Sequence, residues 1–474
     1  MENAQYQITY VGSCNEDWNG EVDQKVVERF ATIHAFHGDG SFPEGKVELL
    51  DDIVLELFDE VNPSEEVFVV LTKKPDYKLD KNTLDKLVTP VIAKKHFKLG
   101  AALRRPGGGP TNCAYNTGTL YASMHVTTPI KLVVLEASQY CLGVFNSEIK
   151  GRDGSKVVEV YAVRPERDSF SNVNLAVNTH ENGEREKFDF TTGESPFETS
   201  EISSLENGLR SDKPQMYVVN SVKDRNYSEA IERFLQSINR SVHKFVLAAT
   251  GSMISKNYDS TFKLMGKSDI YVSNIEELYD LLRGITKKDP ESKEEVLVRE
   301  SKCESWGLQG NWNSLLDDTT DISAIERKVP NKRLIEGIRY IQSQQEKNNG
   351  CKGRVYITCG KYGAVAADGN GNIYFQATHP EAVKQAKFLN GAGDSFAATM
   401  IGFEAIEVSQ PIDRILEYSV AASQIEVRRR GANSEGTLTK SAIEGELQKQ
   451  QGELYKLVGD SFKLQKERVV SDNV

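Results

Sequence analysis

The stretch Asn390-Gly391-Ala392-Gly393-Asp394-Ser395-Phe396 is the most informative part of this sequence. Apolar residues follow it at helical spacing, so its three small residues open a helix. Backbone N–H groups at such a helix start, together with the helix dipole, favour an anion such as a phosphate. Asp394 falls in the first turn, where a carboxylate can take a proton from a hydroxyl that attacks a phosphoryl group. A simpler interpretation, in which glycine opens the helix and Asp394 caps it, explains the same residues.

The rest of the chain alternates between predicted strands and helices. The first buried run ends at Gly12, as strands do where an α/β sheet presents a loop to a ligand. Such alternation indicates βαβ units and a mostly parallel sheet. The predicted strands are 8–11, 67–71, 131–135, 216–219, 245–248, 270–272 and 355–358, with a hairpin over 364–375. The predicted helices are 84–91, 111–124, 229–238, 276–282, 334–341, one opened by Gly391 to Gly393, and a last, amphipathic one at 412–420.

Three regions depart from this alternation. Residues 19–100 are charged, and we interpret them as an elaboration around the core. Between 155 and 192, apolar and polar residues alternate on both sides of Asn182-Gly183, which predicts a β-hairpin. Residues 286–332 are charged and poorly patterned, which predicts a surface insertion. We therefore expect residues 1–474 to form one α/β domain with these additions.

The composition is that of a globular protein with an acidic balance. The chain has 474 residues, 58 Lys plus Arg against 69 Asp plus Glu, a net charge of −11 and 39% hydrophobic residues. Its longest basic run is Arg428-Arg429-Arg430, too short for the charge that binding to nucleic acid or anionic membranes requires. No signal peptide or membrane span is expected, because no run of about 18 apolar residues occurs. The six cysteines form no Cys-x-x-Cys pair, which argues against a disulfide framework and for a reducing, cytoplasmic location.

A second glycine-rich turn, Gly107-Gly108-Gly109-Pro110-Thr111-Asn112, precedes a predicted buried helix. Glycines let a ligand approach the backbone, and the Asn112 amide can donate to and accept from a hydroxylated molecule. Asp17, which follows Gly12 in the same loop, could also accept hydrogen bonds from substrate hydroxyls. A plain loop with Asn112 as helix cap and a solvated Asp17 is the simpler alternative.

Two further turns follow predicted strands. Asn274-Ile275-Glu276-Glu277 opens a helix, and its amide and carboxylate could orient water around Mg²⁺, which needs few protein ligands. The same residues fit a capping box, with Asn274 as the cap and Glu277 reaching back, and the two interpretations do not exclude each other. Thr358-Cys359-Gly360-Lys361-Tyr362-Gly363 is a glycine-containing turn that could lie against a nucleotide.

Taken in order, these motifs resemble the ribokinase-like (PfkB) carbohydrate and nucleoside kinases. The resemblance covers most of the chain apart from 19–100 and 286–332, and Asn390 to Asp394 is its most specific part. Residues 427–432 also look like the family's closing segment near the nucleotide base. The resemblance implies a three-layer α/β/α fold with a mostly parallel central sheet and a small β-lid. The predicted hairpin within 155–192 is our candidate for that lid.

The resemblance also implies an activity: transfer of the γ-phosphoryl group of ATP, with Mg²⁺, to an alcohol. Asp394 would act as the base, and Gly391, Ala392 and Gly393 would form the anion hole. The residues implied for ATP and its metal ion are Asn274, Glu277, Thr358, Gly360, Gly363 and Asn390, with Glu277 holding Mg²⁺ through water. The residues implied for the acceptor are Asp17, Gly107, Gly108 and Asn112.

The acceptor is the least constrained part of this expectation. On the breadth of the family we expect a sugar. Phosphofructokinase-type members have an arginine before the lid's Asn-Val pair, whereas Phe170-Ser171 precede Asn172-Val173 here, which predicts an unphosphorylated acceptor. A nucleoside is the alternative, because residues 245–254 and Asn390 resemble adenosine kinases.

The sequence departs from the family pattern at Phe388 and Leu389, where many members have Asp and Thr. This departure argues against the monovalent-cation activation of some members. The long N-terminal elaboration leaves oligomerisation open, and a homodimer is compatible with it. Two other readings remain: a kinase-like protein that binds ligands without turnover, and an ADP-dependent sugar kinase of the related superfamily.

Overall fold

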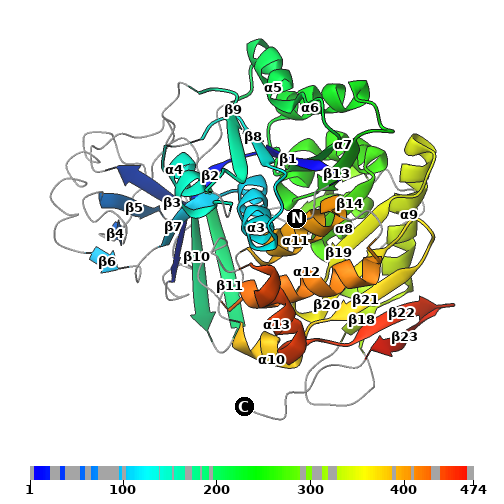
Figure 1. Cartoon of the computed structure of the whole chain (residues 1–474). Coiled ribbons are helices and arrows are strands. Elements are labelled where there is room, and N and C mark those ends of the chain that lie inside the picture. The colour runs from blue at the N-terminus through cyan, green and yellow to red at the C-terminus, as the bar shows by residue number, and fades with distance from the viewer. Residues whose placement is uncertain are drawn as a thin grey trace.

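A computed structural model of the chain shows an α/β body with smaller sheets beside it (Figure 1). The residues that the structure describes are 5–21, 32–37, 54–58, 66–72, 96–98, 103–137, 139–151, 154–165, 173–181, 184–191, 196–288, 295–300, 312–318, 328–386, 391–406, 410–428 and 438–466. No helix in these ranges is long and apolar enough to cross a membrane.

The central sheet has eleven strands in the order β23-β22-β21-β20-β19-β14-β13-β12-β1-β8-β9. Neighbouring strands from β9 to β19 pair parallel, and those from β19 to β23 pair antiparallel. The prediction of a mostly parallel sheet is therefore confirmed. The strands are β1 (Gln7–Gly12), β8 (Ile130–Val134), β9 (Val158–Ala162), β12 (Gln215–Asn220), β13 (Lys244–Ala248), β14 (Ile270–Asn274), β19 (Arg354–Thr358), β20 (Gly363–Ala367), β21 (Ile373–Ala377), β22 (Leu454–Val458) and β23 (Ser461–Lys466).

Helices cover both faces of this sheet, because successive side chains of its strands point to opposite sides. Tyr10 of β1 belongs to one apolar core and Val11 to the other. The helices over the first core are α3 (Gly109–Met124), α4 (Gln139–Glu148), α11 (Ala392–Ile406), α12 (Ile412–Glu426) and α13 (Lys440–Gln450). Those over the second core are α5 (Ile202–Leu209), α6 (Arg225–Ser237), α7 (Gly251–Lys267), α8 (Ile275–Arg283) and α9 (Lys332–Asn349).

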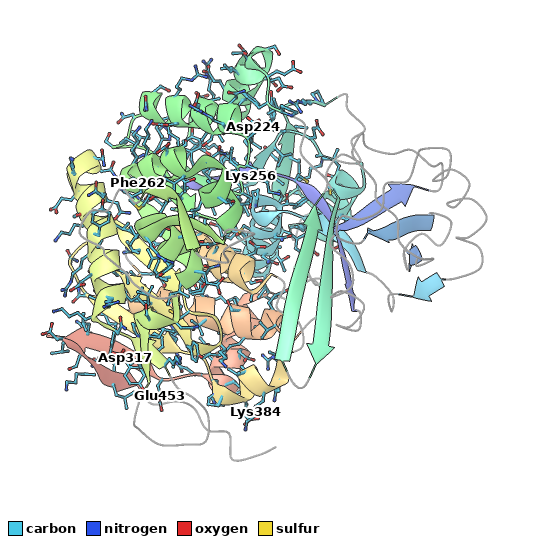
Figure 2. The ribbon with its side chains drawn as sticks, turned by 180° about the vertical axis from the view of Figure 1, so that it is seen from behind. Asp224, Lys256, Phe262, Asp317, Lys384 and Glu453 are labelled. Carbon is cyan, nitrogen blue, oxygen red and sulfur yellow. The ribbon has the colours of Figure 1, made fainter. Side chains whose placement is uncertain are left out.

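Figure 2 shows the second helical layer from behind, with Lys256 and Phe262 of α7 labelled. The Phe262 ring lies 6.4 Å, centroid to centroid, from Tyr340 of α9, which joins these two helices. The sequence patterns did not predict α7. Its helical course is interrupted at Asn257, whose side chain donates to the carbonyl of Lys223 at 2.7 Å. The three-layer α/β/α arrangement confirms the predicted fold class.

A second, four-stranded sheet lies beside the body in the order β11-β10-β2-β7 (Figure 1). Strands β10 (Val173–Glu181) and β11 (Glu184–Thr191) form the predicted hairpin around residues 182–183. The predicted extent of the lid is wrong at its start, because β9 pairs parallel with β8 and belongs to the central sheet. The small sheet instead recruits β2 (Asn15–Glu21) and β7 (Leu103–Gly107), which sequence patterning did not reveal.

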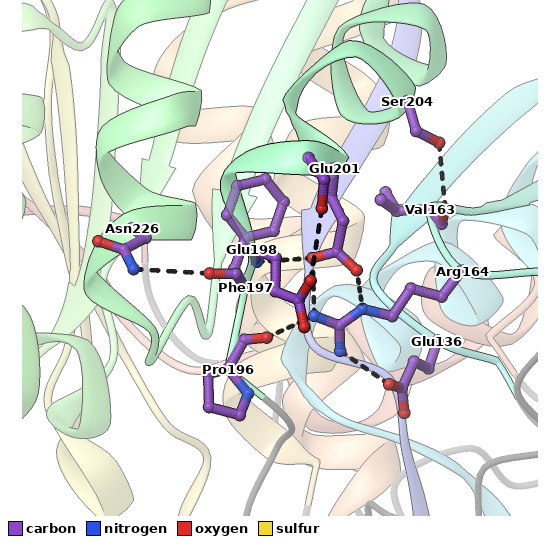
Figure 3. A network of polar contacts seen from close by, with 10 residues as sticks. Glu136, Val163, Arg164, Pro196, Phe197, Glu198, Glu201, Ser204 and Asn226 are labelled. Carbon is purple, nitrogen blue, oxygen red and sulfur yellow. Dashed lines mark hydrogen bonds and ion pairs between the residues drawn. The ribbon is translucent and has the colours of Figure 1, made fainter.

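A buried arginine joins the segments of the body that flank the hairpin of β10 and β11 in the sequence (Figure 3). Arg164 follows β9, where the chain departs toward β10, and it donates to Glu136 at 2.8 Å. It also donates to Glu201 and to the carbonyl of Pro196, where the chain returns from β11. Hydrogen bonding to Glu201 raises the pKa of Arg164, so the guanidinium stays charged despite its burial.

The N-terminal elaboration contains a further four-stranded sheet in the order β3-β5-β4-β6. Its strands are β3 (Thr32–His37), β4 (Val54–Phe58), β5 (Glu66–Thr72) and β6 (His96–Lys98). The predicted strand 67–71 is confirmed as β5, whereas the other three strands were not predicted. The predicted helix 84–91 lies outside the described residues.

Two predictions for the later part of the chain need correction. Residues 312–318 form a short 3-10 helix, Trp312–Leu315, and strand β17 (Leu316–Asp318), which pairs with β18 (Lys328–Pro330). Leu315 is fully buried in the second core, so this segment is not a surface insertion, although β15 (Gly284–Lys288) and β16 (Glu295–Glu300) form a separate hairpin. The predicted helix 412–420 is confirmed as α12, but α13, β22 and β23 follow it.

Candidate active site

The order of strands in the central sheet contains a switch point beside β1. The chain proceeds from β1 to β8 and β9 on one side, then continues on the other side with β12. In open α/β sheets, ligands bind at the carboxyl ends of the strands where the order reverses. Gly12 and Asn220 are paired at those ends of β1 and β12. A Cβ on Gly12 would lie 1.8 Å from the carbonyl oxygen of Asn220, so only glycine fits.

The glycine-rich turn before α3 packs against the same point. Gly108 has φ of 86°, a left-handed conformation that favours glycine, and its carbonyl accepts from the N–H of Asn112 at 2.9 Å. A Cβ on Gly109 would lie 2.3 Å from Oδ1 of Asn220. These glycines therefore let the N-terminus of α3 approach the end of β12 closely.

The predicted anion-binding turn opens α11. Gly391 has φ of 80°, and its carbonyl accepts from the N–H of Ser395 at 2.8 Å. Because the first N–H groups of a helix have no partner within the helix, those of the following small residues can serve an anion. A Cβ on Gly393 would meet no atom within 4 Å, so open space lies beside this turn.

The two helix starts meet at Asp394. Nδ2 of Asn112 donates to Oδ2 of Asp394 at 2.7 Å. Below this contact, the packing of α3 on α11 continues through polar groups: Asn116 donates to Ser395 Oγ at 3.1 Å and Thr117 to the carbonyl of Ala398 at 3.1 Å. These buried hydrogen bonds fix one helix start against the other. They bring together two motifs that are far apart in the sequence.

Asn274 and Glu277 form the predicted capping box at the start of α8. The N–H of Asn274 donates to Glu277 Oε2 at 2.8 Å, and the N–H of Glu277 donates to Asn274 Oδ1 at 2.7 Å. Glu277 Oε1 also accepts from the N–H of Gly251 at 2.9 Å, which ties the start of α7 to α8.

The pKa of Glu277 is raised to about 7, chiefly by burial and to a smaller extent by the carboxylates of Asp394 and Glu276, against the two backbone hydrogen bonds that lower it. The carboxyl groups of Glu277 and Asp394 therefore interact electrostatically. Two carboxylates that repel each other in this way provide a favourable environment for a cation. The capping role and a metal role are compatible, because each carboxylate oxygen can accept more than one hydrogen bond.

A cavity of about 330 Å³ lies beside the start of α11. Three predicted nucleotide residues line it, namely Thr358, Gly360 and Gly363, and so do Ala392 and Gly393. The other lining residues are Lys361, Ala364, Thr378, Ala382, Val383, Ala386, Phe396, Val420, Ser423, Gln424 and Val427. The lining is mostly apolar and its polar groups are few, a composition that suits a flat aromatic base.

The remaining predicted residues lie at different places. Asn274 and Glu277 are not among the residues that line this cavity. Asp17 lies on β2 of the small sheet, opposite Arg105 of β7, and Gly107 ends β7. Both therefore belong to the small sheet, whereas Asn112 belongs to α3 of the body. Asn390 lies outside the described residues.

Sequence reasoning missed several residues of the site. Asn220 ends β12 at the switch point and Ser221 follows it, with φ of 53°, which is unusual for a residue other than glycine. Ser423 of α12 lines the cavity and donates to the carbonyl of Ala392 at 2.9 Å, and its neighbour Gln424 is buried. Polar residues within the buried pattern of α12 were the signal that could have found this pair.

Comparisons with known proteins bear on the C-terminal segment and on the fold. The model of the pfkB family carbohydrate kinases matches residues 336–439, which include Asp394 and all the residues that line the cavity. No curated protein sequence matches the chain.

Among solved structures, Escherichia coli phosphofructokinase-2 in complex with potassium is similar with 14% identity and a TM-score of 0.51 over 94% of this chain and 98% of that one. The same enzyme with substrates and products is similar with 13% identity and a TM-score of 0.50, over 93% of this chain and 99% of that one. A putative ribokinase II from E. coli gives 12% identity and a TM-score of 0.49, over 93% and 99%. A C-terminal segment of the chain thus matches the pfkB family carbohydrate kinases, as the sequence motifs predict, and the fold of the chain is similar to that of phosphofructokinase-2.

Proposed function

We propose that this protein transfers the γ-phosphoryl group of ATP to a hydroxyl of a small sugar. The observation that carries the proposal is the contact between Asn112 and Asp394 at 2.7 Å, beside the cavity that Gly393 lines. In this arrangement Asp394 would be the carboxylate base, the start of α11 would bind the anion, and the neighbouring cavity would hold the base of the nucleotide. Phosphoryl transfer needs all three, since its catalysis consists mainly of positioning and charge stabilisation.

On the nucleotide side, the apolar cavity would hold the adenine base, with Thr358, Gly360 and Gly363 along the nucleotide. The polyphosphate would then extend toward the start of α11. The N–H groups of Gly391, Ala392 and Gly393 would stabilise the charge that develops on the transferring phosphoryl group. Asn390 completes this segment in the sequence.

The metal side is supported by the electrostatics of Glu277. Mg²⁺ retains most of its water molecules and needs few protein ligands, so Glu277 and Asn274 would hold it through water. Bound there, Mg²⁺ supplies charge neutralisation for the phosphates. Glu277 would lose its proton on binding the cation, because an opposite charge lowers the pKa of a carboxyl group.

On the acceptor side, Asp394 would take the proton of the attacking hydroxyl. Asn112 would orient that carboxylate and, with Asp17, Gly107 and Gly108, hold other hydroxyls of the acceptor. We assign the lid role to the sheet of β2, β7, β10 and β11, which carries Asp17 and Gly107 and whose closure would exclude water from the reaction. The body and this lid would then act as one kinase domain.

The experiment that tests the proposal measures Mg·ATP consumption with a panel of free sugars, sugar phosphates and nucleosides, and repeats it with ADP as donor. We expect turnover with ATP and a free sugar. Turnover with nucleosides alone would show that the acceptor is a nucleoside and not a sugar. Turnover with ADP alone would show that the phosphoryl donor is ADP and not ATP. Turnover of sugar phosphates alone would contradict an unphosphorylated acceptor. ATP binding without turnover of any acceptor would favour a protein that binds ligands without catalysis.

A further inference from the structure

The short helix α10 (Pro380–Gln385) forms one wall of the cavity beside α11. Ala382, Val383 and Ala386 contribute to the lining from this side. A helix of six residues is not stable by itself, so its position must be set by contacts with its surroundings. The polar contacts at its two ends are therefore important for the shape of the cavity.

Both ends of α10 are held by hydrogen bonds. At its start, the N–H of His379 donates to Oε1 of Gln424, a residue of α12 that also lines the cavity, at 2.8 Å. At its end, Oε1 of Gln385 accepts from Nη1 of Arg428 at 3.3 Å. Gln424 and Arg428 lie one helical turn apart, and Nε of Arg428 donates to the carbonyl of Gln424 at 2.9 Å.

These two contacts converge on a single carboxylate. Oε1 of Glu446, on α13, accepts from Nε2 of Gln424 at 3.2 Å, and its Oε2 pairs with Nη2 of Arg428 at 2.5 Å. Glu446 is 7% exposed, so water does little to replace either interaction. It is not among the residues that line the cavity.

We propose that Glu446 is a positioning residue for the nucleotide site: through Gln424 and Arg428 it sets the place of α10 and thereby the affinity for the nucleotide. This inference rests on the proposed function. It assigns a role to α13, which the sequence analysis did not foresee.

The physical reason is that one carboxylate orients both tethers. Without its charge, Arg428 loses its ion pair, and Gln424 keeps only the carbonyl of Gln450, at 2.9 Å, as acceptor for its amide. Both tethers of α10 are therefore less firmly oriented, although Gln385 still accepts from Nε2 of Gln450 at 3.3 Å. Binding of the nucleotide must then order this wall again, which lowers affinity. The hydrogen bonds of Asn112 and Cys113 to Asp394 are made without any atom of α10 or α13, so we expect them to be kept.

The test substitutes Glu446→Gln, which keeps the shape of the side chain and removes its charge. We expect the dissociation constant and the KM for ATP to rise about tenfold, the effect of losing one charge-assisted hydrogen bond. The kcat and the KM for the acceptor should be unchanged. ATP binding is measured directly with a fluorescent ATP analogue, so that the result does not depend on turnover.

Glu404→Gln is the matched control. Glu404 pairs with Arg354 at 2.6 Å, and the side-chain exposures of this pair, 5% and 24%, are close to the 8% and 23% of Glu446 and Arg428. It belongs to α11 but does not line the cavity. Glu404→Gln should lower stability while leaving affinity for ATP unchanged.

Arg428→Gln tests the same inference with a substitution that should disturb the fold less, because Arg428 is more exposed than Glu446. If Glu446 acts through Arg428, the double variant Glu446→Gln/Arg428→Gln should bind ATP no more weakly than whichever single variant has the lower ATP affinity. Unchanged ATP affinity in folded Glu446→Gln, or equal losses in Glu446→Gln and Glu404→Gln, would overturn the inference. Failure of the unmodified protein to bind ATP would instead overturn the proposed function.

Discussion

The titration of Glu277 gives a quantitative test of the site that does not require knowledge of the acceptor. Its carboxyl group is half-buried at the start of α8 and interacts electrostatically with Asp394, and its pKa is raised from the ordinary value of 4.5 to about 7. Below pH 4.5 the group is protonated in both the folded and the unfolded chain. As the pH rises toward 7, the unfolded chain releases its proton first, so the free energy of unfolding falls. Above about pH 7 the group is ionised in both states, and the free energy of unfolding falls no further on its account.

The size of this loss follows from the two pKa values. At 1.36 kcal/mol per pH unit, the difference between 4.5 and about 7 corresponds to about 3 kcal/mol. Glu277→Gln cannot titrate, so the difference in unfolding free energy between the two proteins should change by about this amount between pH 4.5 and 8. A constant offset is also expected, because a glutamine has one acceptor oxygen for the two N–H groups of Gly251 and Asn274.

The assay is urea denaturation of both proteins at several pH values, with Glu276→Gln as control. Glu276 is the exposed neighbour of Glu277 on the same helix turn, so its substitution should produce a much smaller pH-dependent change. A difference in unfolding free energy between the unmodified protein and Glu277→Gln that does not vary with pH would refute the reasoning. It would show that Glu277 is fully ionised in the folded protein and is not available as a group that Mg²⁺ deprotonates.

Three further predictions concern the two helix starts and the end of β1. Asn112→Asp places a second carboxylate against Asp394 at the position of a 2.7 Å hydrogen bond, so the acid limb of the kcat/KM profile should move to higher pH, whereas an unchanged profile would contradict the contact. Gly393→Ala adds a methyl group into open space, so the unfolding transition should be unchanged or higher while the KM for ATP rises. A lower unfolding transition would argue against this packing. Gly12→Ala puts Cβ 1.8 Å from the carbonyl of Asn220, so it should lower the melting temperature markedly in calorimetry. A stability equal to that of the unmodified protein would exclude the close approach of β1 and β12.

The parts of the fold that sequence patterns predicted are those whose signals are local. Buried runs such as 8–11 and 355–358 end at glycine-containing turns, and the structure has β1 and β19 there. The hairpin of β10 and β11 was found from period-two alternation around Asn182-Gly183. In each case a few neighbouring residues determine the local conformation.

What the sequence did not reveal depends on partners distant in the chain. Strand β2 reads as a polar loop, yet it pairs with β10 and β7, more than 80 residues away. The strand β9 looked like part of the alternating lid, but its pairing with β8 assigns it to the central sheet. The contact of Asn112 with Asp394 spans 282 residues and has no local signature. Motif order suggested that these residues cooperate, and only the packing of α3 on α11 explains how.

The most direct test of the account compares the unmodified protein with Asp394→Asn in two measurements on the same samples, acceptor-dependent turnover of Mg·ATP and equilibrium binding of a fluorescent ATP analogue. The account predicts that turnover falls by about a thousandfold, as expected for loss of a general base, while nucleotide binding is retained. Turnover of Asp394→Asn within a few-fold of the unmodified protein would contradict the central claim that Asp394 accepts the proton of the attacking hydroxyl.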